Sequence, residues 1–262
     1  MRSVILLSST AALLAACAVT PAPPPPPPPP VVAKADLAPP DAYYFNYALP
    51  ARDASGTFAS PNINLTEQEA IFHLRSALNV AALSCRKMEG MDMTDNYNTY
   101  IRKYRLTLAK ANRTIDARYA REVDGGKRAR DAHMTSLYNH FARPATLGTF
   151  CPMALKHLNA AIALPDTTAA ITDYSQTAVR EIEDVFQQHY ASIEQYQIAY
   201  RQAMRDNGQT PPPMATVALE EQVGSPGETL SPDVAAAIAK AAEEADRDAA
   251  APIDPTDVPQ PN

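Results

Sequence analysis

The prolines of this chain are concentrated at its two ends. Of 25 prolines, only three lie between residues 62 and 206. Proline interrupts helices and strands, and the flanks also hold few large apolar residues that could build a core. We therefore expect one globular domain over residues 62–208, followed by a disordered acidic tail rich in Pro and Ala over residues 209–262. A domain of this length buries a sizeable core without a metal or a second subunit.

The net charge of −6 is unevenly distributed. Residues 207–262 carry ten carboxylates against Lys240 and Arg247, a net −8, which leaves +2 on residues 1–206. An acidic tail on a weakly basic body is unlike the basic surface of nucleic-acid-binding proteins, so we expect no nucleic acid partner. No apolar run after the N-terminus approaches the roughly 20 residues of a membrane-spanning helix.

The N-terminus has the layout of a secretion signal, with Arg2 before an apolar stretch over residues 4–14. The residues Leu14-Ala15-Ala16-Cys17 then resemble the lipobox of the bacterial lipoprotein class, which has an aliphatic residue, two small residues and an invariant cysteine. The resemblance implies that residues 1–16 are a signal peptide removed before Cys17. The alternative is an ordinary secretory signal in which Cys17 is incidental.

For the mature chain, the resemblance implies a diacylglyceryl thioether on Cys17 and a further fatty acid, such as palmitate, on its amino group. Several acyl chains together form a stable membrane anchor, because one chain alone binds only marginally. Ala18 is not the aspartate that commonly retains lipoproteins on the inner membrane. The class therefore implies an outer-membrane location, with the domain facing the periplasm.

Residues 17–61 read as a tether. The eight consecutive prolines Pro23–Pro30 favour polyproline II, which rises about 3.1 Å per residue and would span roughly 25 Å. A stiff spacer explains this run without a partner, although a proline-binding groove is an alternative. Residues 38–61 carry aromatic side chains, which we expect to lie on the domain.

Between residues 62 and 208 apolar residues recur every three or four positions, which predicts helices. Thr66-Glu67-Gln68-Glu69 has the pattern of a capping box at a helix start. No stretch alternates cleanly as a strand would, so the fold class is all-α, an antiparallel bundle of four to five helices. The expected helices run from Thr66 to Cys85, from about Tyr97 to before Gly125, over residues 127–142 up to Pro144, from Pro152 in a first turn through Ile162, and from Pro165 to Asp206.

With Cys17 lipidated, Cys85 and Cys151 remain, and each continues an apolar helical stripe. An even pair of cysteines in an oxidising envelope normally forms a structural disulfide. A redox-active pair would usually be close in sequence, which this pair is not. We therefore expect Cys85 and Cys151 to be bonded.

A loop after Cys85 holds Met88, Met91 and Met93. Thioethers are soft ligands that select Cu(I), so this loop is the candidate metal site. The alternative is that these methionines fill irregular gaps at the end of the bundle. We expect no other cofactor.

The remaining polar residues show no catalytic pattern. The five histidines form no HExxH pair and are expected at the surface or its boundary, and Glu181, Glu183 and Asp184 are expected on a solvated face. The chain also lacks GxSxG, phosphate-loop and dinucleotide motifs. The sequence therefore favours a non-enzymatic interaction or structural module with an envelope protein as partner, and a periplasmic Cu(I)-binding module is the alternative.

One stretch, residues 86–130, is basic, with twelve Lys and Arg against six Asp and Glu. Such a patch can meet anionic lipid headgroups or an acidic partner. The alternative is a solvated helix face with local ion pairs.

Overall fold

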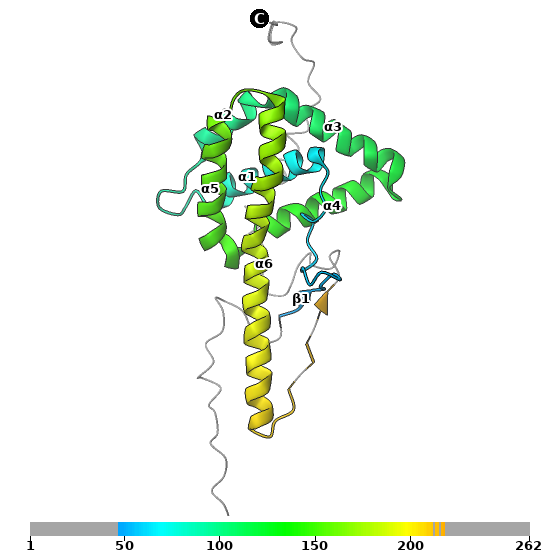
Figure 1. Ribbon diagram of the computed structural model, residues 1–262, viewed down its shortest axis with the longest axis vertical. Coiled ribbons are helices and arrows are strands. Elements are labelled where there is room, and N and C mark those ends of the chain that lie inside the picture. The colour runs from blue at the N-terminus through cyan, green and yellow to red at the C-terminus, as the bar shows by residue number, and fades with distance from the viewer. Residues whose placement is uncertain (1–46, 212, 215, 218–262) are drawn as a thin grey trace, which may run out of the picture. The chain divides into compact units, whose positions relative to one another are not determined.

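The computed structural model describes residues 47–211, 213–214 and 216–217. Cys17, the proline run and the acidic residues after Val217 lie outside this part of the chain. The all-α fold predicted from the sequence is confirmed (Figure 1). No described helix is both long and apolar enough to cross a membrane. The described elements are β1 (Leu49–Pro50), α1 (Glu67–Ser84), α2 (Thr94–Lys103), α3 (Arg105–Glu122), α4 (Gly126–Phe141), the short 3-10 helix η2 (Pro144–Thr146), α5 (Leu147–Ala163), α6 (Thr168–Asp206) and β2 (Thr216–Val217).

The first helix, α1, is the centre of the bundle. Its predicted capping box is present: the Thr66 hydroxyl accepts from the Glu69 amide at 3.3 Å, and the Glu69 carboxylate accepts from the Thr66 amide at 2.9 Å. Helices α2 to α6 all pack against α1. Because α1 is surrounded, its core side chains cover most of its circumference instead of one stripe.

The second predicted helix is two helices, which corrects the expected count of four to five to six. The helix is interrupted at Tyr104, which lies between α2 and α3. The Tyr104 hydroxyl donates to the Ala161 carbonyl at 2.8 Å. Beside it, the Lys103 ammonium donates to the Ile162 carbonyl at 2.7 Å. These bonds hold the joint against the end of α5, so α2 packs along α5 while α3 turns onto α1 and α4. The apolar spacing continues through the break, so periodicity alone could not locate it.

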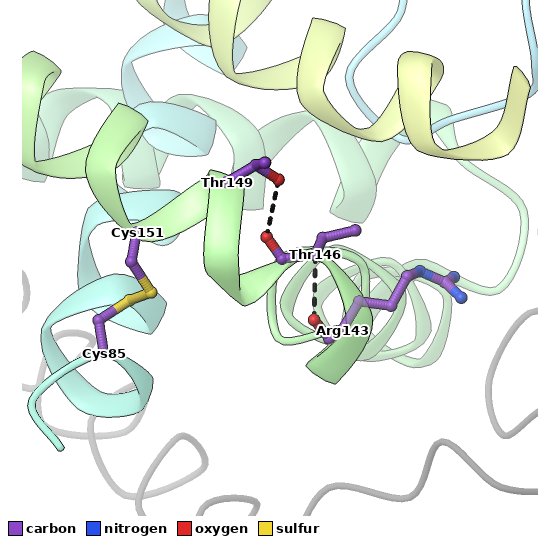
Figure 2. Close-up of a disulfide and its surroundings, with 5 residues drawn as sticks. All are labelled: Cys85, Arg143, Thr146, Thr149 and Cys151. Atoms are coloured by element: carbon purple, nitrogen blue, oxygen red, sulfur yellow. Dashed lines mark hydrogen bonds between the residues drawn. A yellow bond between two sulfur atoms is a disulfide. The ribbon is translucent and has the colours of Figure 1, made fainter. Parts of the chain in front are cut away.

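The fourth predicted helix starts earlier than expected. Pro152 lies inside α5 and not in its first turn, because η2 leads directly into α5. The Thr146 hydroxyl donates to the Arg143 carbonyl at 3.0 Å, and the Thr149 hydroxyl donates to the Thr146 carbonyl at 3.1 Å (Figure 2). These side chains occupy backbone acceptors around the helix start. Pro144 ends α4 as predicted.

A disulfide links the two buried cysteines. It joins Cys85, the C-cap of α1, to Cys151 in α5, with 5.8 Å between their Cα atoms (Figure 2). The two cysteines are 66 positions apart, and α2, α3 and α4 lie between them. The bond therefore closes a loop around half of the bundle.

The last helix, α6, has 39 residues and is about 58 Å long at 1.5 Å per residue. Its first half packs in the bundle, and its second half continues past the other helices beside β1 (Figure 1). Parallel pairing of Leu49 with Thr216 and of Pro50 with Val217 joins β1 to β2. A pair of two-residue strands is too short for an alternating pattern, so the sequence showed no sign of it.

Candidate functional site

Residues 47–62, called here the lead-in segment, are part of the folded domain. Leu49 and Phe58 are each only 2% exposed, although both precede residue 62, the domain boundary predicted from sequence. The segment runs along α6 and is held by α6 side chains spaced three or four positions apart. Those side chains are Glu183, Gln187, Tyr190, Glu194 and Gln197.

The central contact of this seam is a two-point bond between Gln187 and Phe58. The Gln187 side-chain oxygen accepts from the Phe58 amide, and the Gln187 side-chain nitrogen donates to the Phe58 carbonyl, both at 3.0 Å. The side-chain amide thus satisfies both backbone groups of Phe58, as a neighbouring strand would. The Phe58 ring packs edge-on against Tyr190, with 5.5 Å between ring centroids.

The outer part of the segment is held by charged and polar contacts. Arg52 makes a two-point ion pair with Glu194, with 3.1 Å between Nε and Oε1, and its guanidinium lies 3.7 Å from the centroid of the Phe58 ring. The Gln197 side-chain nitrogen donates to the Tyr47 carbonyl at 2.7 Å. Together with Gln187, these contacts cover nearly three turns of α6 and hold the segment from Tyr47 to Phe58.

Beneath the segment lies a buried polar cluster, called here the Glu183 network. Glu183 is 4% exposed, and its Oε2 accepts from His140 Nε2 at 2.9 Å and from Asn62 Nδ2 at 2.8 Å. Its Oε1 accepts from Gln187 Nε2 at 2.8 Å. The network consists of Asn62, His73, His133, His140, Glu183 and Gln187, from the lead-in segment, α1, α4 and α6.

The hydrogen bonds of Asn62 fix where the protons of the network lie. Because Asn62 donates to Glu183, its side-chain oxygen faces His73, and Nδ1 of His73 must donate to it at 2.8 Å. In neutral His73 the other ring nitrogen, Nε2, is then an acceptor, so Nε2 of His133 donates to it across 3.3 Å. In this series of hydrogen bonds, from His133 through His73 and Asn62, each donor points toward the Glu183 carboxylate. The arrangement stabilises one buried negative charge with directed hydrogen bonds.

The titration of the network follows from its burial. Desolvation, with His133, His140 and Arg118 nearby, holds the pKa of His73 well below its usual value. Burial also lowers the pKa of His133, and the attraction of Glu69 only partly opposes this. Burial alone would raise the pKa of Glu183, but the charge of His140 and the hydrogen bonds from His140, Asn62 and Gln187 keep it below its usual value. The network is therefore built around ionised Glu183 and neutral His73 and His133.

Two expectations about these residues are wrong. His73, His140 and His157 are buried, at 1–2% exposure, and Glu183 is not on a solvated face. The helical register of α6 held the missed signal, because Glu183 lies four positions after Val179 and three before Phe186, on the buried stripe. Burial of a charge there is tolerated because the network supplies its partners.

We predict that the fold loses stability in acid. Unfolded histidine titrates near pH 6.5, whereas His73 and His133 take up protons at lower pH when folded, so the unfolded state binds more protons below pH 6.5. The free energy of unfolding should be highest above pH 6.5 and should fall as the pH decreases. The contribution of His73 to this fall should approach about 1.4 kcal/mol per pH unit. Glu183, with its lowered pKa, adds a further loss below its unfolded value of about 4.5.

Urea unfolding at pH 8, 6.5 and 5.5 measures this effect. His73→Gln keeps a donor toward Asn62 but cannot titrate, so its stability should change less over this pH range than that of wild type. An unfolding free energy that stays constant or increases from pH 8 to pH 5.5 would contradict the prediction.

The other residues singled out in the sequence lie elsewhere. Met93 is 1% exposed, and Met88 and Met91 are partly buried against the same core, which is the packing that gap-filling methionines would have. In the described part of the chain, no three His, Cys, Asp or Glu side chains are arranged to hold a metal ion. Glu181 pairs with Lys156 on the surface, and Asp184 is exposed, as expected. Cys17 lies outside the described residues.

The role that this geometry supports is structural: it holds the lead-in segment in position. Glu183 is almost completely enclosed, and Asn62, which separates it from His73, is an amide that does not readily exchange protons. The network and the α6 side chains hold the lead-in segment in one place on the bundle. Comparison of the chain with protein-family models, with curated proteins and with solved structures found no match.

Proposed function

We propose that this chain is an envelope lipoprotein, anchored by lipid on Cys17 in the outer membrane. Its helical domain faces the periplasm and acts by contact with another envelope protein, not as an enzyme. The resemblance of Leu14-Ala15-Ala16-Cys17 to a lipobox supports the anchor.

The observation that carries this proposal is the attachment of the lead-in segment to α6. This segment connects Cys17 and the proline run to the bundle. A domain that only had to stay near the membrane would need no ordered attachment, whereas Gln187, Glu194 and Gln197 hold the segment over nearly three turns. The lead-in segment thus forms one rigid body with the bundle, as suits a module that presents one surface to a partner.

The second half of α6 is the preferred contact surface. Among the described residues, the exposed large apolar side chains are Ile198, at 53%, and Met214, at 40%. Arg201 connects the regions around these two side chains. It lies one turn after Ile198, and it donates to the carbonyl of Pro213, the residue before Met214, at 3.0 Å. Apolar side chains surrounded by polar groups are common at protein interfaces.

Site-specific photocrosslinking in cells tests the contact. A photoreactive residue at Ile198 should give a discrete adduct with one envelope protein, and the same residue at Arg128, an exposed site on α4, should not. The adduct should also weaken when Cys17→Ser removes the anchor. Equal labelling of abundant neighbours from both positions would argue against a contact module.

We predict that lipidation depends on Cys17 alone. Labelled palmitate should be incorporated into the wild-type chain and be lost in Cys17→Ser, because the thioether and the cleaved amino terminus both require that thiol. Cys85→Ala/Cys151→Ala serves as the control and should keep the label. Equal labelling of wild type and Cys17→Ser would refute lipid attachment at Cys17. It would not contradict the proposed contact role of the helical domain.

A further inference from the structure

The joint between α2 and α3 carries a concentrated positive charge. Residues 96–115 contain five cations and no carboxylate. We call these five residues the basic face: Arg102, Lys103, Arg105, Lys110 and Arg113. Arg102, Lys110 and Arg113 are exposed, and Arg105 is half-buried.

The charge surplus is local to this face. Further along the same helices, Arg118 forms an ion pair with Glu69, and Arg130 forms one with Asp116. Residues 116–130 as a whole contain five cations and three carboxylates, whereas residues 96–115 contain five cations and no carboxylate. The excess of positive charge along these helices is therefore greatest at residues 102–113.

A recess gives this face a defined shape. A cavity of about 350 Å³ is lined by residues 102–107 of the joint and by Asp166, Thr167 and Thr168 at the start of α6. Asp166 is the single carboxylate of that lining. The N-terminal end of a 39-residue helix adds partial positive charge to the same place. The recess thus favours a polar, negatively charged occupant.

We propose that the acidic C-terminal segment of the chain itself, residues 218–262, docks on the basic face. This segment carries ten carboxylates against Lys240 and Arg247, a net −8, opposite in sign to the face. Its 45 residues can extend up to about 150 Å, whereas β2 is about 40 Å along α6 from the recess. Covalent linkage also raises the effective concentration of the segment to about the millimolar range.

Covalent linkage favours this occupant over anionic lipid headgroups. The segment is joined to the domain directly after β2, so it can reach the face whether or not the chain is on a membrane.

Zero-length crosslinking of the full chain in detergent tests the docking. A carbodiimide activates a carboxylate, a lysine amine then displaces the activated group to form an amide, and the reagent leaves as a urea, so Lys110 reports any carboxylate held against the face. At low ionic strength we expect crosslinks from Lys110 to Asp and Glu of residues 218–262, within monomers. About 0.5 M NaCl should reduce their yield about fivefold, because salt screens charges at the surface.

Charge-reversal variants link the effect to the face. Arg102→Glu/Arg113→Glu should lower the Lys110 crosslinks about fivefold, since two like charges then repel the segment. The matched control, Lys127→Glu/Arg128→Glu, reverses two exposed cations at the start of α4 and should leave the yield unchanged. Circular dichroism verifies that both variants fold.

Two results would overturn the proposal. One is a Lys110 crosslink yield that neither salt nor Arg102→Glu/Arg113→Glu changes. The other is an absence of these crosslinks together with binding of the chain to phosphatidylglycerol vesicles that depends on Arg102 and Arg113. That second result would assign the face to lipid. The test does not involve Cys17, so its outcome is independent of the proposed anchor.

Discussion

Replacing Glu183 with alanine is expected to lower the free energy of unfolding by about 3–5 kcal/mol, the range for removing one partner of a buried charged pair. The change leaves His140, Asn62 and Gln187 with donors that lose their acceptor in a site closed to water. It also leaves a space where the carboxylate was. Urea unfolding at pH 7.5 measures the loss.

Glu183→Gln separates charge from shape. The glutamine has nearly the same volume but can accept with only one of its two terminal atoms. If its oxygen takes the place of Oε2, its amide faces the donating nitrogen of Gln187, and if it flips, its amide faces His140 and Asn62. Gln187 cannot turn to compensate, because both ends of its amide are bonded to Phe58. We expect the free energy of unfolding to fall by about 2–3 kcal/mol, because two buried N–H donors then face each other with no acceptor between them.

Asp184→Asn is the matched control. It neutralises an exposed carboxylate one position further along α6 and should change the unfolding free energy by less than about 0.5 kcal/mol. The Glu183 variants should also speed amide exchange at Phe58, since the network lies directly beneath that contact. A Glu183→Ala variant within about 1 kcal/mol of wild type would show that the network does not stabilise the fold.

Local sequence signals predicted those parts of the fold that local interactions decide. The Thr66–Glu69 capping box is contained within four residues, and Pro144 ends a helix by its own covalent geometry. The break at Tyr104 was missed because a contact with Ala161, 57 positions away, produces it. No pattern around Tyr104 encodes that distant partner.

The candidate site was missed for a related reason. Asn62, His73, His133, His140, Glu183 and Gln187 are ordinary polar residues in sequence, and only the packing of four segments brings them together. The helical register placed Glu183 on the buried stripe, but it could not show which groups would satisfy the charge. Composition favours the surface for each of these residues, whereas their hydrogen-bond partners allow burial.

Reducing the Cys85–Cys151 disulfide is the second change with a large expected effect. The bond joins the end of α1 to α5 across 66 positions. In the chain-entropy model, opening a loop of that length frees the unfolded chain and lowers the unfolding free energy by about 4 kcal/mol, an upper figure. Because α2 packs mainly on α5, and α5 is tied to α1 by this bond, exchange should rise first in α2 and the Met88–Met93 loop.

Urea unfolding with and without reductant measures this loss, and Cys85→Ala/Cys151→Ala is the control. The double variant should match the reduced wild type to within about 1.5 kcal/mol, the range for small apolar replacements in a core. It should also be indifferent to reductant, which separates loss of the bond from other effects of the reagent. Both sulfurs are fully buried, so strong reductant at moderate urea is needed to open the bond. An oxidised and a reduced chain that unfold at the same urea concentration would show that the two cysteines are not paired in the native protein.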